Sequence, residues 1–435
     1  MTYATATSLV RARRVSRGGA RRAARGAVAT AAAALALGVA TPTPAVAGPS
    51  WSGQCTFPNK KYEGRPWSLQ RVLLDELWLQ SRGKGVRVAV IDTGVDTRNP
   101  QLKPAVDASR GRNYLPAKDD KGEKIDRGKA NGTTDTVGHG TRVAGIIAAR
   151  PAKGTGFVGL APQATIIPIK QNDAEGHGTA ETLAASIDYA VDAGADIINI
   201  SQDTANAAEP SPELKQAVDR ALGRRRLIVA SAGNDGLGGN VKKTYPASYE
   251  GVLAVAASDR NNERAAFSQS GDFVDVAAPG VDMISTVPLG GHCADSGTSF
   301  AAPYVAGLAA LIKSAHPDWT PRQITAQIQQ TAERSVPGHD RLVGWGVADP
   351  TRALTEDDHP LEHPTAREGL RRAQAPTPAD LHLGETAEER TARLATYVAV
   401  GAVVVVAGLG GVGVAVRDAG RRRNQGRRNG LTGQK

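Results

Sequence analysis

Between Val86 and Asp349 the chain alternates short, almost wholly apolar runs with longer segments in which apolar residues recur at helical spacing. Strands with this continuous apolar character are typical of parallel sheets that helices cover on both faces. A stretch of about 265 residues is long enough for one large α/β domain. We therefore expect three layers, with a mostly parallel central sheet and catalytic or binding residues at the carboxyl ends of its strands. The expected strands are residues 86–91, 197–200, 227–230 and 252–256, and the expected helices are residues 142–149, 181–193, 213–222 and 300–313.

The positive charge of the chain is concentrated at its two ends. The formal net charge is +10, but residues 1–48 contain seven arginines and no acidic residue, and residues 417–435 contain seven Lys or Arg and one Asp. The intervening part therefore carries a net charge of about −3. A nucleic-acid-binding protein needs a basic face on its folded part, so we expect no nucleic acid partner.

Residues 1–47 have the order of a secretory signal peptide. A basic run, Arg11 to Arg25, precedes an alanine-rich apolar stretch, Ala27 to Ala40, and the small residues Ala45-Val46-Ala47 then suit a signal peptidase. We predict that this segment is removed on export. One alternative is that the segment is retained as an anchor. The other is the twin-arginine export route, which the paired arginines suggest.

An uncharged run of 20 residues, 397–416, lies near the other end. At about 1.5 Å per residue, such a helix covers the roughly 30 Å of a bilayer core. We predict a transmembrane helix over residues 396–416 and a basic cytoplasmic tail over residues 417–435, because positive flanks stay in the cytoplasm. The body of the protein would then lie outside the plasma membrane as a single-pass type I protein. A buried core helix is the alternative.

The remaining boundaries follow from composition. Residues 48–85 form an N-terminal extension with three tryptophans and a helical pattern around residues 69–79, which we expect to pack against the main domain, residues 86–350. Residues 351–395 are rich in proline and charge, and they predict a linker. The only cysteines, Cys55 and Cys293, lie in the exported body, where a disulfide can persist. Two unpaired thiols are the alternative.

Three segments place a reactive side chain beside a strand end or a helix start. Asp92 follows the apolar run 86–91 and precedes Thr93-Gly94, while His139 stands between two glycines at the start of a helical pattern. Ser299 lies in the first turn of another helix, where free N–H groups and the helix dipole favour an anion. Each residue alone has a structural explanation, as a turn former, a structural histidine or an N-cap.

Taken together, the three segments resemble the subtilisin-like (subtilase) serine protease family. Their order of Asp, His and Ser is that of the subtilisin-type triad, and the matching sequences are VAVIDTGVD, GHGTRVAGIIAA and SGTSFAAPYVAGLAAL. The resemblance covers residues 86–350 and implies a subtilisin-like three-layer fold with protein or peptide substrates. It also implies that Asp92, His139 and Ser299 form the triad, and that Asn234 in LIVASAGNDG donates to the oxyanion.

Two features qualify the resemblance. A second HGT sequence begins at His177, but the sequence before it resembles a loop that borders the family's substrate cleft, so we favour His139 as the base. The family's cleft-edge strand continues Ser-Leu-Gly-Gly, whereas Ser201 is followed here by Gln202-Asp203-Thr204, and the specificity pockets are therefore not predicted. The scattered aspartates form no recognisable metal loop, so we expect no metal and no cofactor.

The order of segments along the whole chain resembles the mycosins, which are the membrane-anchored subtilisin-like proteases of actinobacterial type VII secretion systems. This resemblance implies association with the type VII secretion membrane complex, and an extension that wraps the catalytic domain. The 38 residues from Gly48 to Gly85 are indeed few for a removable folding pro-domain. Two alternatives stay open. One is a surface-tethered subtilase of broad specificity, and the other is a structural subunit of the secretion complex whose protease activity is dispensable.

Overall fold

The structure is a computed structural model that describes residues 55–118, 121–173, 178–201, 211–239, 243–366 and 385–429. The chain divides into two units, Met1–Ser50 and Trp51–Lys435. The predicted signal peptide lies outside the described residues, and so do His177, residues 202–204 and the last six residues of the tail. The described helices and strands all belong to the second unit.

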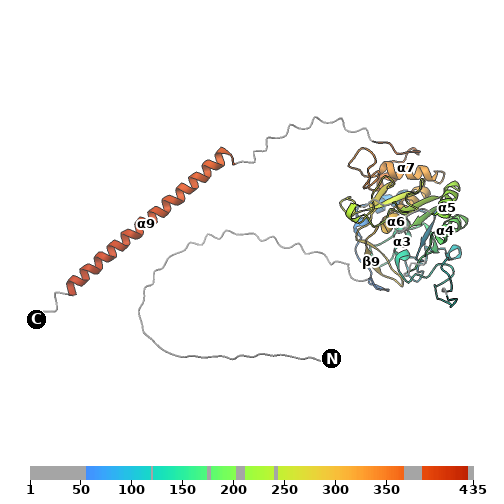
Figure 1. The fold of residues 1–435 in the computed structure, drawn as a ribbon, viewed down its shortest axis with the longest axis horizontal. Helices are drawn as coiled ribbons and strands as arrows, with labels where there is room; N and C mark the ends of the chain where they lie inside the picture. Colours follow the sequence, from blue (N-terminus) through green and yellow to red (C-terminus); the bar gives the residue numbers. More distant parts are fainter. Residues whose placement is uncertain are drawn as a thin grey trace, which may run out of the picture. The chain divides into compact units, whose positions relative to one another are not determined.

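The domain is built on a parallel sheet of seven strands in the order β2-β3-β1-β4-β5-β6-β7. Figure 1 shows the strands of the domain with helices packed around them. All six neighbouring pairs run parallel, which confirms the predicted mostly parallel sheet. A separate antiparallel pair is formed by two further strands. The strands are β1 (Arg87–Asp92), β2 (Arg112–Asn113), β3 (Thr165–Lys170), β4 (Ile197–Ile200), β5 (Leu227–Ser231), β6 (Leu253–Ser258), β7 (Val276–Pro279), β8 (Met283–Thr286) and β9 (His292–Asp295).

Strand β1 lies at the point where the order of the strands changes. Its neighbours are β3 on one side and β4 on the other, with Asp92 opposite Lys170 and Ile91 opposite Ile200. In open α/β sheets a ligand site forms beyond the carboxyl ends of the strands at such a switch point. The last residue of β1 is Asp92, so the topology puts this carboxylate at the expected place.

Helices cover both faces of the sheet. Alternate side chains of β1 enter different cores, since Val88 and Val90 belong to one buried cluster and Ala89 and Ile91 to the other. The first cluster includes α3 and α6, and the second includes α4 and α5, which confirms the three layers. The helices are α1 (Trp67–Gln70), α2 (Leu74–Gln80), α3 (His139–Ala148), α4 (Ala180–Asp192), α5 (Pro212–Gly223), α6 (Thr298–Ala315), α7 (Pro321–Thr331), α8 (Pro350–Thr355) and α9 (Ala387–Asn429).

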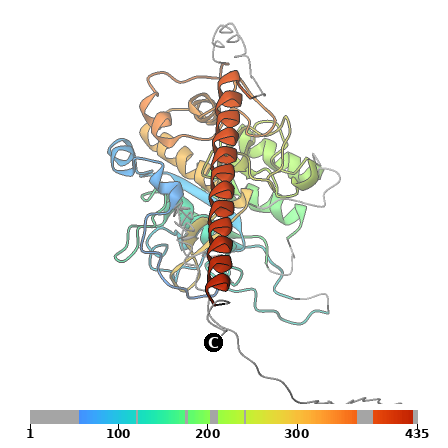
Figure 2. The same ribbon diagram turned by 90° about the vertical axis from the view of Figure 1, so that its left-hand side faces the viewer.

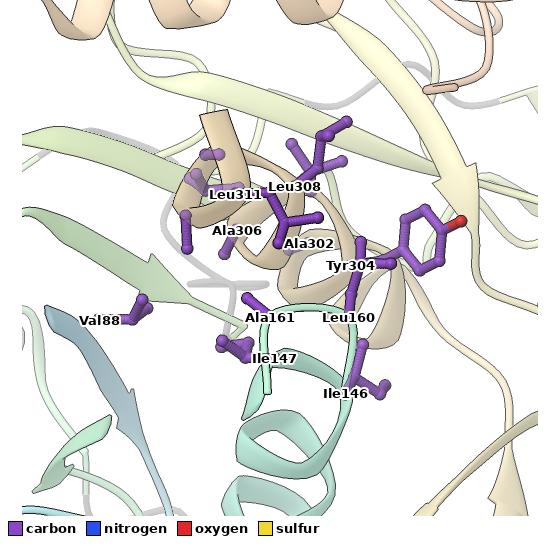
Figure 3. Packing of buried hydrophobic residues seen from close by; sticks show 14 of the residues in the cluster. Val88, Ile146, Ile147, Leu160, Ala161, Ala302, Tyr304, Ala306, Leu308 and Leu311 are labelled. Atoms are coloured by element: carbon purple, nitrogen blue, oxygen red, sulfur yellow. The ribbon is translucent and has the colours of Figure 1, made fainter. Parts of the chain in front are cut away.

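Helix α6 is the central helix of the domain, because every residue from Thr298 to Ile312 is buried. Its alanines and glycine leave little side-chain volume, so neighbouring elements can approach its backbone closely. Figure 3 shows Ile146 and Ile147 of α3 and Ala302 and Ala306 of α6 along the sides by which the two helices approach each other. This packing holds the first turns of α3 and α6 at a fixed separation.

The N-terminal extension is an integral part of the main core. Leu69, Leu74 and Leu77 are buried in the same cluster as α3 and α6. The indole N–H groups of Trp67 and Trp78 donate to the carbonyls of Val281 and Leu160, at 3.0 Å each. The helical pattern expected around residues 69–79 is realised as two short helices, α1 and α2, rather than as one.

A disulfide joins the extension to β9. Cys55 and Cys293 are bonded across a sequence separation of 238 residues. Backbone hydrogen bonds continue the attachment, from the Asn59 N–H to the Gly290 carbonyl and from the His292 N–H to the Lys60 carbonyl, both at 3.0 Å. A cross-link over so long a loop restricts the unfolded chain and thereby stabilises the folded one.

Packed structure continues past residue 350, where we placed the end of the domain. Asp357 accepts from His316 at 2.5 Å, and Gln323 on α7 donates to Glu362 at 2.8 Å. The backbone N–H of Thr365 donates to Gln330 at 2.7 Å. The first part of the predicted linker therefore lies on α7 and on the end of α6.

The last described element is α9, which Figure 2 shows as one continuous helix. Its stretch Ala387–Arg423 is long and apolar enough to cross a membrane. The most apolar part of this stretch is not buried against other parts of the protein. The helix begins at Ala387, before the apolar run predicted for residues 396–416. The charged residues Glu388, Glu389 and Arg390 therefore extend the apolar segment as helix.

Candidate active site

Asp92 and His139 are joined by the central hydrogen bond of the site. The His139 Nδ1 atom lies 2.8 Å from Asp92 Oδ1 and 3.0 Å from Oδ2. The Asp92 carboxylate is fully buried, whereas the His139 side chain is 22% exposed. The Thr93 backbone N–H also donates to Asp92 Oδ1, at 2.7 Å. Because a carboxylate only accepts, this arrangement puts the His139 proton on Nδ1 and leaves Nε2 free to accept a proton.

The start of α3 approaches the end of β1 closely because residue 140 has no side chain. A Cβ atom at Gly140 would lie 2.2 Å from the Gly94 carbonyl oxygen and 3.1 Å from Asp92 Oδ1. Any larger residue would push α3 away from β1. Gly140, one of the two glycines that flank His139, therefore permits the Asp92–His139 contact.

Asp135 is a buried residue that the sequence did not single out and that fixes the start of α3. Its carboxylate accepts hydrogen bonds from the Gly138 N–H at 2.7 Å, from the Thr141 N–H at 2.9 Å and from the Thr141 hydroxyl at 2.6 Å. It also accepts from the Thr93 hydroxyl at 2.9 Å, and that hydroxyl accepts from the Gly140 N–H at 2.9 Å. The residues on either side of His139 are thus tied to the turn after β1.

The pKa of His139 is raised by its surroundings. Burial alone lowers this pKa, but the charge of Asp92 and the hydrogen bond to it outweigh the burial. Arg142 lowers the pKa and Asp135 raises it, both by smaller amounts. A carboxylate that stabilises an imidazolium is what a general base requires once it has accepted a proton.

Ser299 and Asn234 face a common point next to Gly297. Ser299 is the second residue of α6 and is 8% exposed. A Cβ atom at Gly297 would lie 2.9 Å from Ser299 Oγ and 3.7 Å from Asn234 Nδ2, so the absence of that atom keeps the space open. The hydroxyl, the amide N–H₂ group and the free N–H groups of the first helical turn therefore converge.

Thr298 sets the orientation of the Asn234 amide. The Thr298 backbone N–H and hydroxyl both donate to Asn234 Oδ1, at 2.9 and 3.0 Å. The same hydroxyl accepts from the Gly233 N–H at 3.1 Å. With Oδ1 held in this way, Nδ2 is the part of the amide that remains to meet a ligand.

Phe300 lies between the two halves of the site. Its ring centroid is 5.3 Å from that of His139, and its neighbour in the chain is Ser299. The described residues show no hydrogen bond between the His139 ring and the Ser299 hydroxyl. Such bonds are often long in unliganded active sites and shorten when substrate binds.

The sequence of the domain matches the model of the Subtilase family over residues 83–346. The chain belongs to the subtilase family. Subtilisin Savinase of Lederbergia lenta is 38% identical over 283 residues, which are 65% of this chain and 96% of that protein. Subtilisin E of Bacillus subtilis (strain 168) is 36% identical over 269 residues, which are 61% of this chain and 66% of that protein.

Solved structures similar to this subtilase include proteases of type VII secretion systems. The MycP3 protease from the type VII (ESX-3) secretion system has a TM-score of 0.60 and 33% identity, and the match covers 69% of this chain and 90% of that one. MycP1 from Mycobacterium smegmatis has a TM-score of 0.61 and 30% identity, covering 73% of this chain and 91% of that one. The protein is thus a subtilisin-like serine protease related to the mycosins, and it acts on peptide bonds.

His292 illustrates how the structure separates a structural histidine from a candidate base. It is buried, its Nδ1 accepts from the Tyr62 N–H at 3.0 Å, and its Nε2 lies 2.8 Å from the Gln101 side-chain oxygen. Burial lowers its pKa to about 4, so the ring stays neutral and joins β9 to the extension. The described residues also contain no group of three or more His, Cys, Asp or Glu side chains that could hold a metal ion.

We predict that Asn234→Ala lowers kcat by about 10²- to 10³-fold with little change in KM, because one oxyanion donor is lost. Thr298→Val should lower kcat about tenfold, because the amide of Asn234 loses one of its two anchors and turns more freely. Both effects are measured by steady-state hydrolysis of a fluorogenic peptide.

The matched control is Thr298→Ser, which keeps the hydroxyl that binds Asn234 Oδ1 and should retain most of the wild-type kcat. A wild-type kcat in Asn234→Ala would show that this amide does not reach the reacting carbonyl.

Proposed function

We propose that this subtilase is a membrane-anchored extracytoplasmic serine endopeptidase that cleaves substrates through Asp92, His139 and Ser299 and works with a type VII secretion system. The observation that supports the catalytic part is the Asp92–His139 hydrogen bond of 2.8 Å. A second support is the open space at Gly297, which both Ser299 and Asn234 border. A serine protease needs such a pair together with a nucleophilic hydroxyl and an oxyanion donor.

In the proposed reaction, Ser299 Oγ attacks the peptide carbonyl carbon while its proton passes to His139 Nε2. The electron pair of the carbonyl moves to oxygen, and Asn234 Nδ2 and the Ser299 N–H donate to this oxyanion. Asp92 stabilises the imidazolium. When the intermediate collapses, His139 gives the proton to the leaving amine and an acyl-serine remains. Water, deprotonated by His139, then releases the carboxylic product and restores Ser299.

The membrane anchor is proposed from α9 and its flank. The helix has an apolar stretch of sufficient length, and Arg417, Arg421, Arg422 and Arg423 follow the uncharged run 397–416. Positive residues of this kind remain on the cytoplasmic side. The domain of residues 86–350, the extension 48–85 and the linker 351–395 would then lie outside, and the tail 417–435 inside.

The type VII role is proposed from the similar structures. The MycP3 and MycP1 proteases belong by description to ESX-3 and ESX-1 type VII secretion systems, and the matches cover nine-tenths of each of those chains. The extension that packs into the core of this chain fits a protease whose N-terminal segment is permanent. A structural role in the secretion complex is the second candidate, and a deletion strain complemented with an inactive variant separates it from proteolysis.

The catalytic assignment predicts the activities of three variants of the full-length protein in detergent micelles. Ser299→Ala and His139→Ala should each lower peptide hydrolysis by at least about 10³-fold, because nucleophile and base act as one unit. His177→Ala, which changes the second HGT sequence, serves as the control and should keep most of the wild-type kcat. Loss of activity in His177→Ala with retention in His139→Ala would reverse the assignment of the base.

The proposed topology predicts which side of the membrane a single new thiol occupies. The two native cysteines are bonded to each other and do not react with a maleimide. In intact cells a membrane-impermeant maleimide should label His359→Cys, an exposed position, and should label Thr432→Cys only after permeabilisation. The opposite pattern would place the protease domain in the cytoplasm.

The type VII role predicts the behaviour of a strain that lacks this protease. The wild-type gene should restore secretion and trimming of the type VII substrates, and Ser299→Ala, inserted at an equal level, should leave the secreted substrates untrimmed. If the strain with Ser299→Ala secretes at the full level, the chain also has a structural role in the secretion complex that does not need cleavage. If secretion and trimming are unchanged in the deletion strain, the type VII role is wrong.

A further inference from the structure

Arg142 is a nearly buried arginine on the helix that carries His139, and its side chain contacts the strand that leads to Ser299. It is the fourth residue of α3, and its side chain is 11% exposed. Its Nε atom donates to the Gly138 carbonyl at 3.2 Å, and its Nη1 atom lies 2.7 Å from Asp295 Oδ2. The Arg142 guanidinium therefore binds both the Gly138 carbonyl, just before His139, and the Asp295 carboxylate of β9.

The carboxylate that Arg142 contacts belongs to Asp295, in the segment that leads from β9 to Ser299. Asp295 is the last residue of β9 and precedes Ser299 by four residues. Its Oδ1 atom accepts from the Ser296 N–H at 2.8 Å, so both oxygens are engaged. Strand β9 is itself fixed by the disulfide at Cys293. Arg142 thus connects α3 to a turn that is anchored on one side and leads directly into the first turn of α6.

The guanidinium also lies over the ring of Phe300, with its central carbon 5.5 Å from the ring centroid. A cation over an aromatic face is attracted by the ring quadrupole. The same ring lies 5.3 Å from the His139 ring. The Phe300 ring therefore contacts both Arg142 and His139, which lie three residues apart on one face of α3, and Phe300 is next to Ser299 in the chain.

His139 is surrounded by charges of both signs. Asp92 faces it from β1, Asp135 from the loop before α3, and Arg142 from its own helix. Lys170 of β3 lies near the two aspartates and donates to the Thr93 carbonyl at 2.7 Å. Asp295 partly balances the charge of Arg142. Arg142 favours the neutral imidazole, and it is the group on α3 whose charge opposes that of Asp92.

We propose that Arg142, held by Asp295, is a positioning residue that sets the separation of His139 and Ser299 through Phe300 and tunes the charge around His139. The inference rests on the proposed triad. The two proposals can be tested separately, because a subtilase that loses activity in Ser299→Ala can still keep full activity when Arg142 is replaced.

The test compares the pH dependence of kcat/KM for three variants of the full-length protein in detergent micelles, with one fluorogenic peptide. In Arg142→Met, kcat should fall about tenfold while KM changes less than about twofold, because an arrangement needed in the transition state is loosened. The acid limb of the pH profile of kcat/KM, where His139 loses its proton, should move to higher pH in this variant. Without the nearby cation, the imidazole keeps its proton to a higher pH. In Asp295→Asn the cation is less balanced, so the acid limb should move to lower pH.

Arg142→Lys separates charge from geometry, because it keeps the cation and loses the planar fork. Its acid limb should stay near that of the wild type while kcat falls. This variant also serves if Arg142→Met fails to fold, which thermal melting followed by circular dichroism would reveal.

The matched control is another Arg–Asp pair that joins two helices on the opposite face of the sheet. Arg220 of α5 contacts Asp188 of α4 at 2.9 and 2.6 Å, and Arg220→Met and Asp188→Asn should leave kcat and the acid limb unchanged. Two results would overturn the inference. One is a folded Arg142→Met variant with the kcat and the acid limb of the wild type, and the other is a folded Arg142→Lys variant with the kcat of the wild type. Shifts of the acid limb in the same direction for Arg142→Met and Asp295→Asn would overturn the charge part of it.

Discussion

The close approach of helix α3 to the end of β1 is the constraint on which the rest of the site depends. It brings the His139 ring to 2.8 Å from a fully buried carboxylate, and such a carboxylate is costly unless it is hydrogen-bonded. Asp92 meets this cost through His139 and the Thr93 N–H. The approach in turn requires the bare backbone of Gly140 and the hydrogen bonds that Asp135 accepts around it. The parallel sheet supplies the common edge at which these elements meet.

The second half of the site is positioned by packing rather than by charge. Helix α6 is buried over most of its length, so its first turn cannot shift without disturbing the core that it shares with α3. The extension belongs to that core, since it contributes apolar side chains to it and is tied by a disulfide to β9. Removal of the extension would expose this apolar surface. The extension is therefore part of the folded domain.

Much of this arrangement could be predicted from the sequence, because apolar runs and motifs are local. The runs located β1, β4, β5 and β6, and the segments around Asp92, His139 and Ser299 carried the family resemblance. The roles of Asp135, Thr298 and Arg142 depend on partners far along the chain, such as Thr93, Asn234 and Asp295, and no local pattern encodes them. The break between α1 and α2 and the packing of residues up to 366 likewise follow from tertiary contacts.

The central claim is that Ser299 is the one nucleophile that the Asp92–His139 pair activates. It is tested most directly by treating the full-length protein with diisopropyl fluorophosphate and locating the adduct by peptide mass spectrometry. We expect one adduct per chain, on the peptide that contains Ser299, and none after prior denaturation. An adduct on a different serine, with Ser299 unmodified, would contradict this claim.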